Sequence, residues 1–71
     1  MNITLNGEKE IINIPNPTIT DLLKIKDVKM PDMVSVEYNG DMLEKDQFQT
    51  TTLKDGDEVE FLYFMGGGHL I

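Results

Sequence analysis

Cysteine and arginine are absent from this sequence of 71 residues, and histidine occurs only once. Without cysteine the chain can form no disulfide, no zinc–thiolate site and no thiol nucleophile. The single histidine, His69, has no second histidine and no cysteine with which it could bind a metal or build a nucleophilic triad. We therefore expect no metal site in this chain and no catalytic role for His69.

Positive charge is also scarce. The sequence has six lysines and thirteen aspartates and glutamates, which gives a formal net charge of −7. Such a surface repels phosphate backbones and anionic lipids, so we expect neither nucleic acid nor a membrane as a partner. The charge is equally compatible with simple solubility and with a protein partner that has a basic face.

Long apolar runs are missing too. No segment approaches the length of a membrane span, and the opening MNITLNGEKE lacks the basic and apolar regions of a signal peptide. The expected location is therefore the cytoplasm. A chain of this size buries only about 60% of the surface that its unfolded form exposes, so one compact core is expected and a self-sufficient enzyme is not.

The first residues predict a β-hairpin. Ile3 and Leu5 alternate with polar residues before Asn6-Gly7, a dipeptide typical of two-residue hairpin turns, and the apolar residues Ile12 and Ile14 follow it. The two prolines of the next segment, PNP, then end the pairing, because proline has no N–H for a strand ladder.

The apolar period changes after these prolines. Thr18 and Asp21 have the spacing of a capping box. Ile19, Leu22 and Leu23 fall on one side of a helix. We expect a short helix here, whose stability must come from packing because its length is too small for propensity alone.

The second half of the chain predicts another hairpin and one further strand. Val34 and Val36 alternate with polar residues before Asn39-Gly40, and residues 41–43 supply the return strand. A polar segment anchored by Phe48 follows. An Asp-Gly turn then leads into the most apolar strand of the sequence, EVEFLYF.

The order of hairpin, helix, hairpin and final strand predicts an α+β fold, a small mixed sheet with one short helix across one face. A strand that follows both hairpins often completes such a sheet from the middle, which is the β-grasp arrangement. We assign residues 1–65 to this domain and residues 66–71 to a flexible C-terminal tail.

The final strand predicts an outward-facing apolar patch. Side chains alternate between faces, so Val59, Phe61 and Tyr63 share one face of the sheet, while Leu62 and Phe64 share the other. One helix covers only one face, so we expect Leu62 and Phe64 to point outward. Either a loop covers them or they form a partner site, together with Met65.

The acidic segment KDGDEVE resembles a cation site only in its composition. It lacks the ligand number and the spacing of a calcium loop. A tight turn that leads into a strand explains Asp55, Asp57 and Glu58 better.

Three consecutive glycines, Gly66, Gly67 and Gly68, follow the final strand. A flexible terminus is one explanation. The other is that glycine lets the backbone lie close to a second surface, so that a diglycine can reach into a narrow active site. The residues alone leave both interpretations open.

Taken in order, the hairpins, the short helix, the segment DGDEVEFLYF and the glycines make residues 1–68 resemble the ThiS/MoaD family, most closely its thiamine branch. These proteins are ubiquitin-like β-grasp sulfur carriers. The molybdopterin-synthase subunits of the family are usually longer, with an additional helical segment. On this resemblance the family's terminal diglycine falls on Gly67-Gly68.

The resemblance implies a co-substrate rather than an enzyme, with no catalytic residue and no bound cofactor of its own. An E1-like adenylyltransferase of the ThiF type uses ATP and magnesium to adenylate the terminal glycine, here Gly68. Sulfur from a persulfide donor protein then gives a thiocarboxylate, which thiazole synthase uses in the thiamine branch. A chain without cysteine cannot hold sulfur as a persulfide, which agrees with a carrier that uses its terminus. We expect it to be a monomer when alone.

The residues His69-Leu70-Ile71 depart from the family pattern, because Gly68 is in a peptide bond and has no free carboxylate. Some relatives are precursors trimmed by a metalloprotease, and several of these serve cysteine or homocysteine synthesis. We therefore hypothesise a protease that cleaves after Gly68. Transfer to an amino-acid or molybdopterin pathway and a role as a ubiquitin-like modifier stay open as alternatives.

Overall fold

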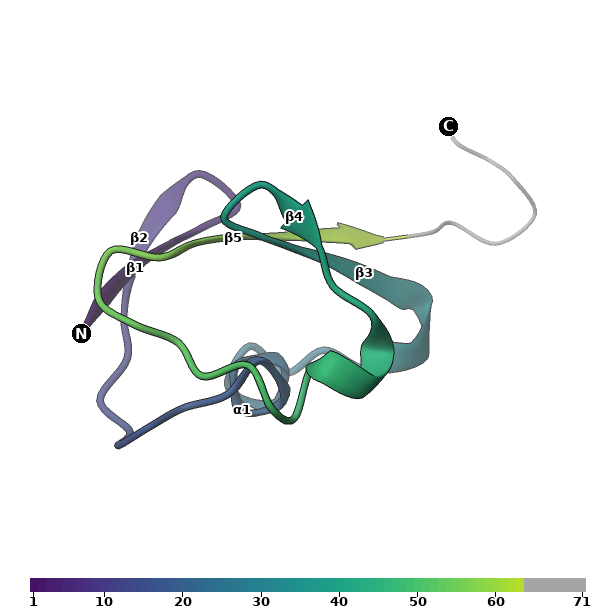
Figure 1. Ribbon diagram of the computed structural model, residues 1–71, viewed down its shortest axis with the longest axis horizontal. Helices are drawn as coiled ribbons and strands as arrows, with labels where there is room; N and C mark the ends of the chain where they lie inside the picture. Colours follow the sequence, from purple (N-terminus) through teal and green to yellow (C-terminus); the bar gives the residue numbers. More distant parts are fainter. Residues whose placement is uncertain (64–71) are drawn as a thin grey trace.

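The computed structural model describes residues 1–63, which form a five-stranded mixed sheet with one helix packed across one face (Figure 1). The strand order is β2-β1-β5-β3-β4. The α+β class and the β-grasp arrangement predicted from the sequence are confirmed, since the last strand lies in the middle of the sheet.

The first hairpin joins β1 (Asn2–Leu5) to β2 (Glu8–Ile11) in antiparallel register. Asn6 and Gly7 have φ angles of 53° and 84°, as a primed two-residue turn requires. Ile12, just after β2, is buried, whereas Ile14 is 42% exposed. The chain leaves the sheet before the prolines, so Ile14 does not extend the strand.

The predicted helix is α1 (Ile19–Ile25), and its capping box is present. Asp21 N donates to Thr18 Oγ1 over 3.2 Å, and Thr18 N donates to Asp21 Oδ2 over 3.0 Å. Ile19, Leu22 and Leu23 are buried against the sheet, as their spacing indicates.

The second hairpin joins β3 (Val34–Tyr38) to β4 (Asp41–Met42), preceded by the 3-10 turn η1 (Pro31–Met33). A second 3-10 turn, η2 (Lys45–Gln47), places Phe48 in the core. The final strand β5 (Glu58–Tyr63) pairs in parallel with β1 and antiparallel with β3.

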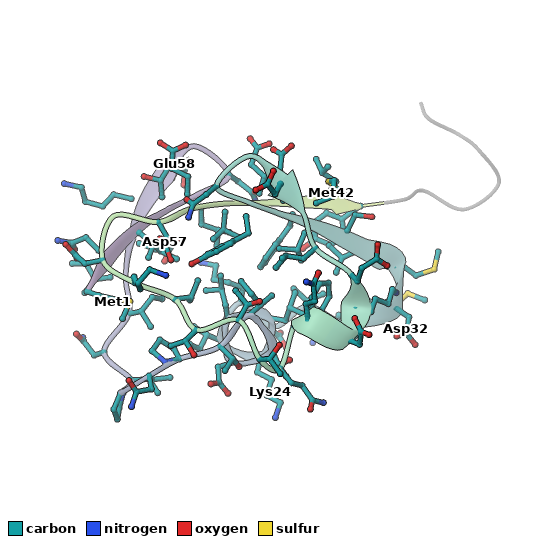
Figure 2. The ribbon with its side chains drawn as sticks, in the orientation of Figure 1. Met1, Lys24, Asp32, Met42, Asp57 and Glu58 are labelled. Carbon is teal, nitrogen blue, oxygen red and sulfur yellow. The ribbon has the colours of Figure 1, made fainter. Side chains whose placement is uncertain are left out.

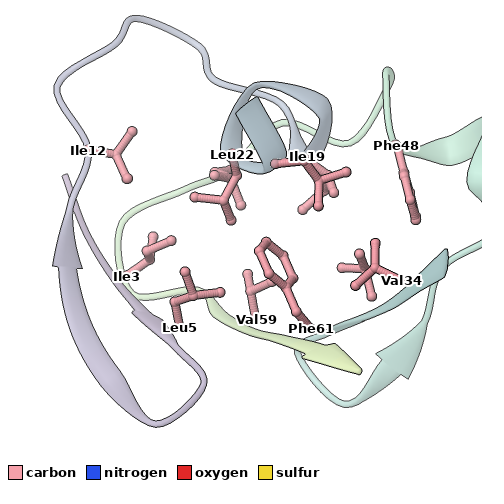
Figure 3. Close-up of a cluster of buried hydrophobic side chains, with 12 residues drawn as sticks. Ile3, Leu5, Ile12, Ile19, Leu22, Val34, Phe48, Val59 and Phe61 are labelled. Atoms are coloured by element: carbon pink, nitrogen blue, oxygen red, sulfur yellow. The ribbon is translucent and has the colours of Figure 1, made fainter. Parts of the chain in front are cut away.

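The core lies between the sheet and α1 (Figure 3). The strands β1, β3 and β5 and the helix α1 supply most of its apolar side chains. Ile12 joins them just after β2, and Phe48 and Leu53 close the core from the connecting segment. Its buried members are Ile3, Leu5, Ile12, Ile19, Leu22, Leu23, Val34, Val36, Phe48, Leu53, Val59 and Phe61.

Candidate functional site

The face of the sheet opposite α1 is covered by no other element of residues 1–63, and we call it the open face. Figure 2 shows Glu58 and Met42 on this side, whereas Asp57 lies on the side of the core. Strand alternation and the strand registers place the following residues on the open face: Asn2, Thr4, Lys9, Ile11, Ser35, Glu37, Met42, Glu58, Glu60 and Leu62.

Leu62 is 43% exposed on the open face, as the sequence predicts. Tyr63 shares the core face with Phe61 but is 54% exposed. Figure 1 shows α1 end-on, crossing below the sheet well before the arrowhead of β5. The helix therefore does not reach the end of the strand, and alternation alone overestimates how far Tyr63 is covered.

The other predicted site residues, namely Phe64, Met65 and the glycines Gly66, Gly67 and Gly68, lie outside the described residues, as does His69. The structure instead places Leu62 and Tyr63 at the end of the central strand, directly before them in the sequence. The partner surface that we predict from Leu62, Phe64 and Met65 thus begins at an exposed strand end.

Asp57, in the turn before β5, is buried and accepts three hydrogen bonds, two from the β3–β4 turn and one from the loop before β5. Tyr38 Oη donates over 2.6 Å and Lys54 N over 2.7 Å to its Oδ2, and Asn39 Nδ2 donates over 3.2 Å to its Oδ1. The predicted tight turn is confirmed, with Gly56 at a φ of 90°. Asp55 accepts a separate hydrogen bond from Asn2 N over 2.7 Å.

These hydrogen bonds set the ionisation of both side chains. Burial on its own raises the pKa of Asp57, but the hydrogen bonds from Tyr38, Lys54 N and Asn39 outweigh it and hold the pKa below its ordinary value. Burial, followed by the hydrogen bond to Asp57, raises the pKa of Tyr38. At neutral pH the pair is therefore a carboxylate and a neutral phenol.

Two asparagines fix the hairpin turns against the central strand. Asn6 Oδ1 accepts from Phe61 N over 2.8 Å, and Asn39 Oδ1 accepts from Glu58 N over 2.7 Å. Their own backbone N–H groups donate to Val59 O and Glu58 O. Both Asn-Gly turns are thus held beside β5, one on each side.

Between these turns the open face is hollowed by about 390 Å³. Glu37 on β3 lies directly opposite Glu60 on β5. Glu58 lies two residues before Glu60, on the same face of β5. The remaining lining comes from Thr4, Gly7, Gly40 and Val59. This acidic hollow was not predicted from the sequence, because strand alternation assigns Glu60 to a face but does not give the register between β3 and β5.

Among residues 1–63, Glu37, Glu58 and Glu60 take part in no ion pair. Lys26 pairs with Glu10 over 2.9 Å, and the other two pairs join Lys29 to Asp27 and Lys45 to Asp32. No group of three or more His, Asp or Glu side chains in this part of the chain is arranged to hold a metal ion. None of its helices has the length and apolar character needed to span a membrane.

The model of the ThiS family matches residues 2–68, nearly the whole chain. The chain belongs to the ThiS family. Proteins of this family are small sulfur carriers, and the mixed sheet with one helix is their ubiquitin-like β-grasp fold. A comparison with curated proteins finds no match.

Two solved structures from Geobacter metallireducens are similar to this ThiS family member. The crystal structure of its thiamine biosynthesis protein ThiS is 48% identical, covers 96% of this chain and all of its own, and superposes with a TM-score of 0.84. An NMR solution structure of a thiamine biosynthesis protein from the same organism is 47% identical, with coverages of 100% and 92% and a TM-score of 0.78.

Proposed function

We propose that this protein carries sulfur for thiamine synthesis as a thiocarboxylate on Gly68. The observation that carries the proposal is the family match, which spans the described fold and ends at Gly68. The destination is supported by the two similar structures, both of thiamine biosynthesis proteins. The Geobacter protein is named ThiS in one of them.

The chemistry begins with activation, because a carboxylate is a poor electrophile. On an E1-like adenylyltransferase that holds ATP and magnesium, a carboxylate oxygen of Gly68 attacks the α-phosphorus of ATP, which forms an acyl-adenylate and releases pyrophosphate. The terminal sulfur of a donor protein's persulfide then attacks the acyl carbon, and AMP leaves. A thiol cleaves the resulting S–S bond and is itself oxidised to a disulfide, which leaves the thiocarboxylate on Gly68.

In this scheme the protein's own contribution is presentation rather than catalysis. Gly68 lies five residues after Tyr63 in the sequence, so a fully extended chain places it at most about 17 Å from the end of β5. The enzyme that activates Gly68 must therefore approach the strand end, where Leu62 is exposed. We propose Leu62, Phe64 and Met65 as its first contacts.

Activation also requires a free carboxylate, and Gly68 is joined to His69. We propose that a protease cleaves this peptide bond and removes His69, Leu70 and Ile71 before the carrier can work. Thiazole synthase then accepts the sulfur from the trimmed, thiocarboxylated form.

The test compares the chain ending at Gly68 with the chain ending at Ile71. Each is incubated with the adenylyltransferase and ATP-magnesium, and pyrophosphate release is measured. We expect release only from the chain ending at Gly68, because only that chain has the glycine carboxylate. Adding persulfide donor and thiol should then raise its intact mass by one oxygen-to-sulfur exchange.

A chain ending at Gly68 with a C-terminal amide is the matched control, since it keeps every side chain and lacks only the carboxylate. Pyrophosphate release from the amide, or from the chain ending at Ile71, would contradict activation at Gly68. A covalent bond from Gly68 to a lysine of another protein, found in cell extracts in place of the thiocarboxylate, would show a modifier instead.

A further inference from the structure

Both hairpin turns of the sheet consist of the dipeptide Asn-Gly, in which the asparagine side chain can react with the backbone of the next residue. Glycine has no Cβ that would hinder the approach of its backbone N, and asparagine is a thermolabile residue. Asn6-Gly7 and Asn39-Gly40 are exposed, and a Cβ added to either glycine would meet no atom within 4 Å. Each turn therefore has room for a reaction between its own two residues.

The reaction is deamidation through a cyclic imide. The backbone N of the glycine attacks Cγ of the asparagine, and a new N–Cγ bond forms. The Cγ–Nδ2 bond breaks, and Nδ2 leaves as ammonia with the proton of the glycine N–H. Water then opens the ring at one of its two carbonyl carbons, which gives aspartate or isoaspartate. The reaction consumes water and needs no other reagent.

The amide oxygen of each asparagine side chain accepts a hydrogen bond from the backbone of β5. Phe61 N donates to Asn6 Oδ1 over 2.8 Å, and Glu58 N donates to Asn39 Oδ1 over 2.7 Å. A donor at this oxygen stabilises the negative charge that develops on it when Cγ is attacked. Both turns share this feature, so it does not distinguish them.

The amide nitrogens of the two side chains have different surroundings. Asn39 Nδ2 donates to Asp57 Oδ1 over 3.2 Å, and Asp57 is only 6% exposed. No residue of the described range 1–63 accepts a hydrogen bond from Asn6 Nδ2. Loss of ammonia from Asn39 must therefore break a hydrogen bond to a buried carboxylate. The negative charge of Asp57 also opposes the charge that develops on Asn39 Oδ1.

We propose that Asn6 is a deamidation site of the folded protein, and that the hydrogen bond from Asn39 to Asp57 protects the second Asn-Gly turn from the same reaction. The reagent is water, and the products are aspartate and isoaspartate at position 6. The inference goes beyond the proposed function, because neither Gly68 nor a partner protein takes part in it.

The products have different consequences for the first hairpin. Aspartate at position 6 still has a carboxylate oxygen that accepts from Phe61 N. Isoaspartate adds one atom to the backbone of a two-residue turn, whose geometry fixes the register of the strands beside it. Aspartate at position 39 would instead place a second carboxylate against Asp57, where Asn39 Nδ2 now donates. The protected turn is thus the one in which deamidation would be more harmful.

The experiment incubates the full chain in warm, mildly alkaline buffer without denaturant. Samples are digested at intervals, and the peptides that contain residues 6 and 39 are quantified by mass, since deamidation exchanges NH for O. Chromatography separates aspartate from isoaspartate. We expect Asn6 to react about tenfold faster than Asn39, which is the effect on a rate of one hydrogen bond to a charged group.

The same chain in concentrated urea is the matched control, because both asparagines then precede glycine without any tertiary contact. The two sites should react at similar rates there. Equal rates in the folded chain, or a faster reaction at Asn39, overturn the proposal. An Asn6 that stays intact in the folded chain while it reacts in urea overturns it as well.

The variant Asp57→Asn tests the protection separately from the stability of the fold. Its amide NH2 group in the place of Oδ1 cannot accept from Asn39 Nδ2. Deamidation at Asn39 should therefore accelerate, while Asn6 should react as in the wild type. Loss of folding alone would accelerate both sites alike. Acceleration of both sites alike, or of neither, overturns the protective role of Asp57.

Discussion

At the scale of single residues, Asp57 joins segments that lie far apart in the sequence. Tyr38 and Asn39 come from the end of β3 and its turn, and Lys54 N comes from the loop before β5. The carboxylate thus holds the start of the central strand to its neighbour. Because the carboxylate is buried, a donor that is left unpaired when it is removed costs more than the mean value of a hydrogen bond.

We expect Asp57→Asn to lower the free energy of unfolding at pH 7 by about 2–3 kcal/mol, because the variant loses the charge that strengthens these hydrogen bonds. An amide oxygen in the place of Oδ2 still accepts from Tyr38 Oη and Lys54 N, but the amide NH2 group then meets the donor Asn39 Nδ2. Urea unfolding followed by circular dichroism measures this. Asp55→Asn, which keeps an acceptor for Asn2 N, is the control and should cost less than about 0.5 kcal/mol, as surface substitutions usually do.

The same variant has a predicted pH dependence. The pKa of Asp57 is lower in the folded state than in the unfolded state. The contribution of its carboxylate to stability is therefore fully present above the unfolded pKa of about 3.9, and it is lost as the pH falls through the folded pKa. The difference in stability between wild type and Asp57→Asn should stay constant from about pH 5 to 8 and shrink below about pH 4. A difference that persists unchanged in acid would mean that the Asp57 charge is not responsible.

At the scale of elements, the helix and the two hairpins were predicted from short local sequence patterns. The helix start follows from Thr18 and Asp21, three residues apart, and each hairpin follows from an Asn-Gly pair, so these features need no knowledge of the rest of the chain. The central place of β5 followed from the order of the elements.

Long-range features were not predictable in the same way. Asp57 was assigned to a plain turn, because its partners Tyr38 and Asn39 lie 19 and 18 residues away in the sequence. Glu37 and Glu60 face each other only through the register of β3 on β5. A one-residue slip would send one of them to the other face, and one sequence does not fix that register.

The N-cap of α1 at Thr18 contributes to stability. We expect Thr18→Ala to lower the free energy of unfolding by about 1 kcal/mol, because Asp21 N loses its cap and a seven-residue helix has few other internal bonds. Thr18→Ser keeps the hydroxyl and should retain most of the stability. If the alanine and serine variants unfold at the same urea concentration, the cap does not contribute to stability.

At the scale of the whole molecule, negative charge opposes compactness. The chain has a formal charge of −7, and part of it is concentrated on the open face, where Glu37, Glu58 and Glu60 surround the hollow. Self-repulsion of this kind weakens the folded state and is screened by salt.

We therefore expect the urea midpoint of unfolding to rise when NaCl increases from about 0.01 to 1 M, as the screening length falls from about 30 to 3 Å. The rise should be smaller in Glu37→Gln/Glu60→Gln, because one close repulsion is already gone. Equal salt responses of the wild type and the double variant would argue that the repulsion is spread over the surface instead.

The parallel pairing of β1 with β5 also has a mechanical consequence. β1 is the first strand of the described chain and β5 is the last, and the two are neighbours in the sheet. Because they are parallel, a force that pulls the N-terminus and the chain end after Tyr63 apart slides one strand along the other. The bonds Thr4 N to Asp57 O and Asn6 N to Val59 O then bear the load together, and the five register pairs with β3 resist as well. A pull on the end of this chain therefore loads several hydrogen bonds of the central strand at once, instead of opening them one after another from the end.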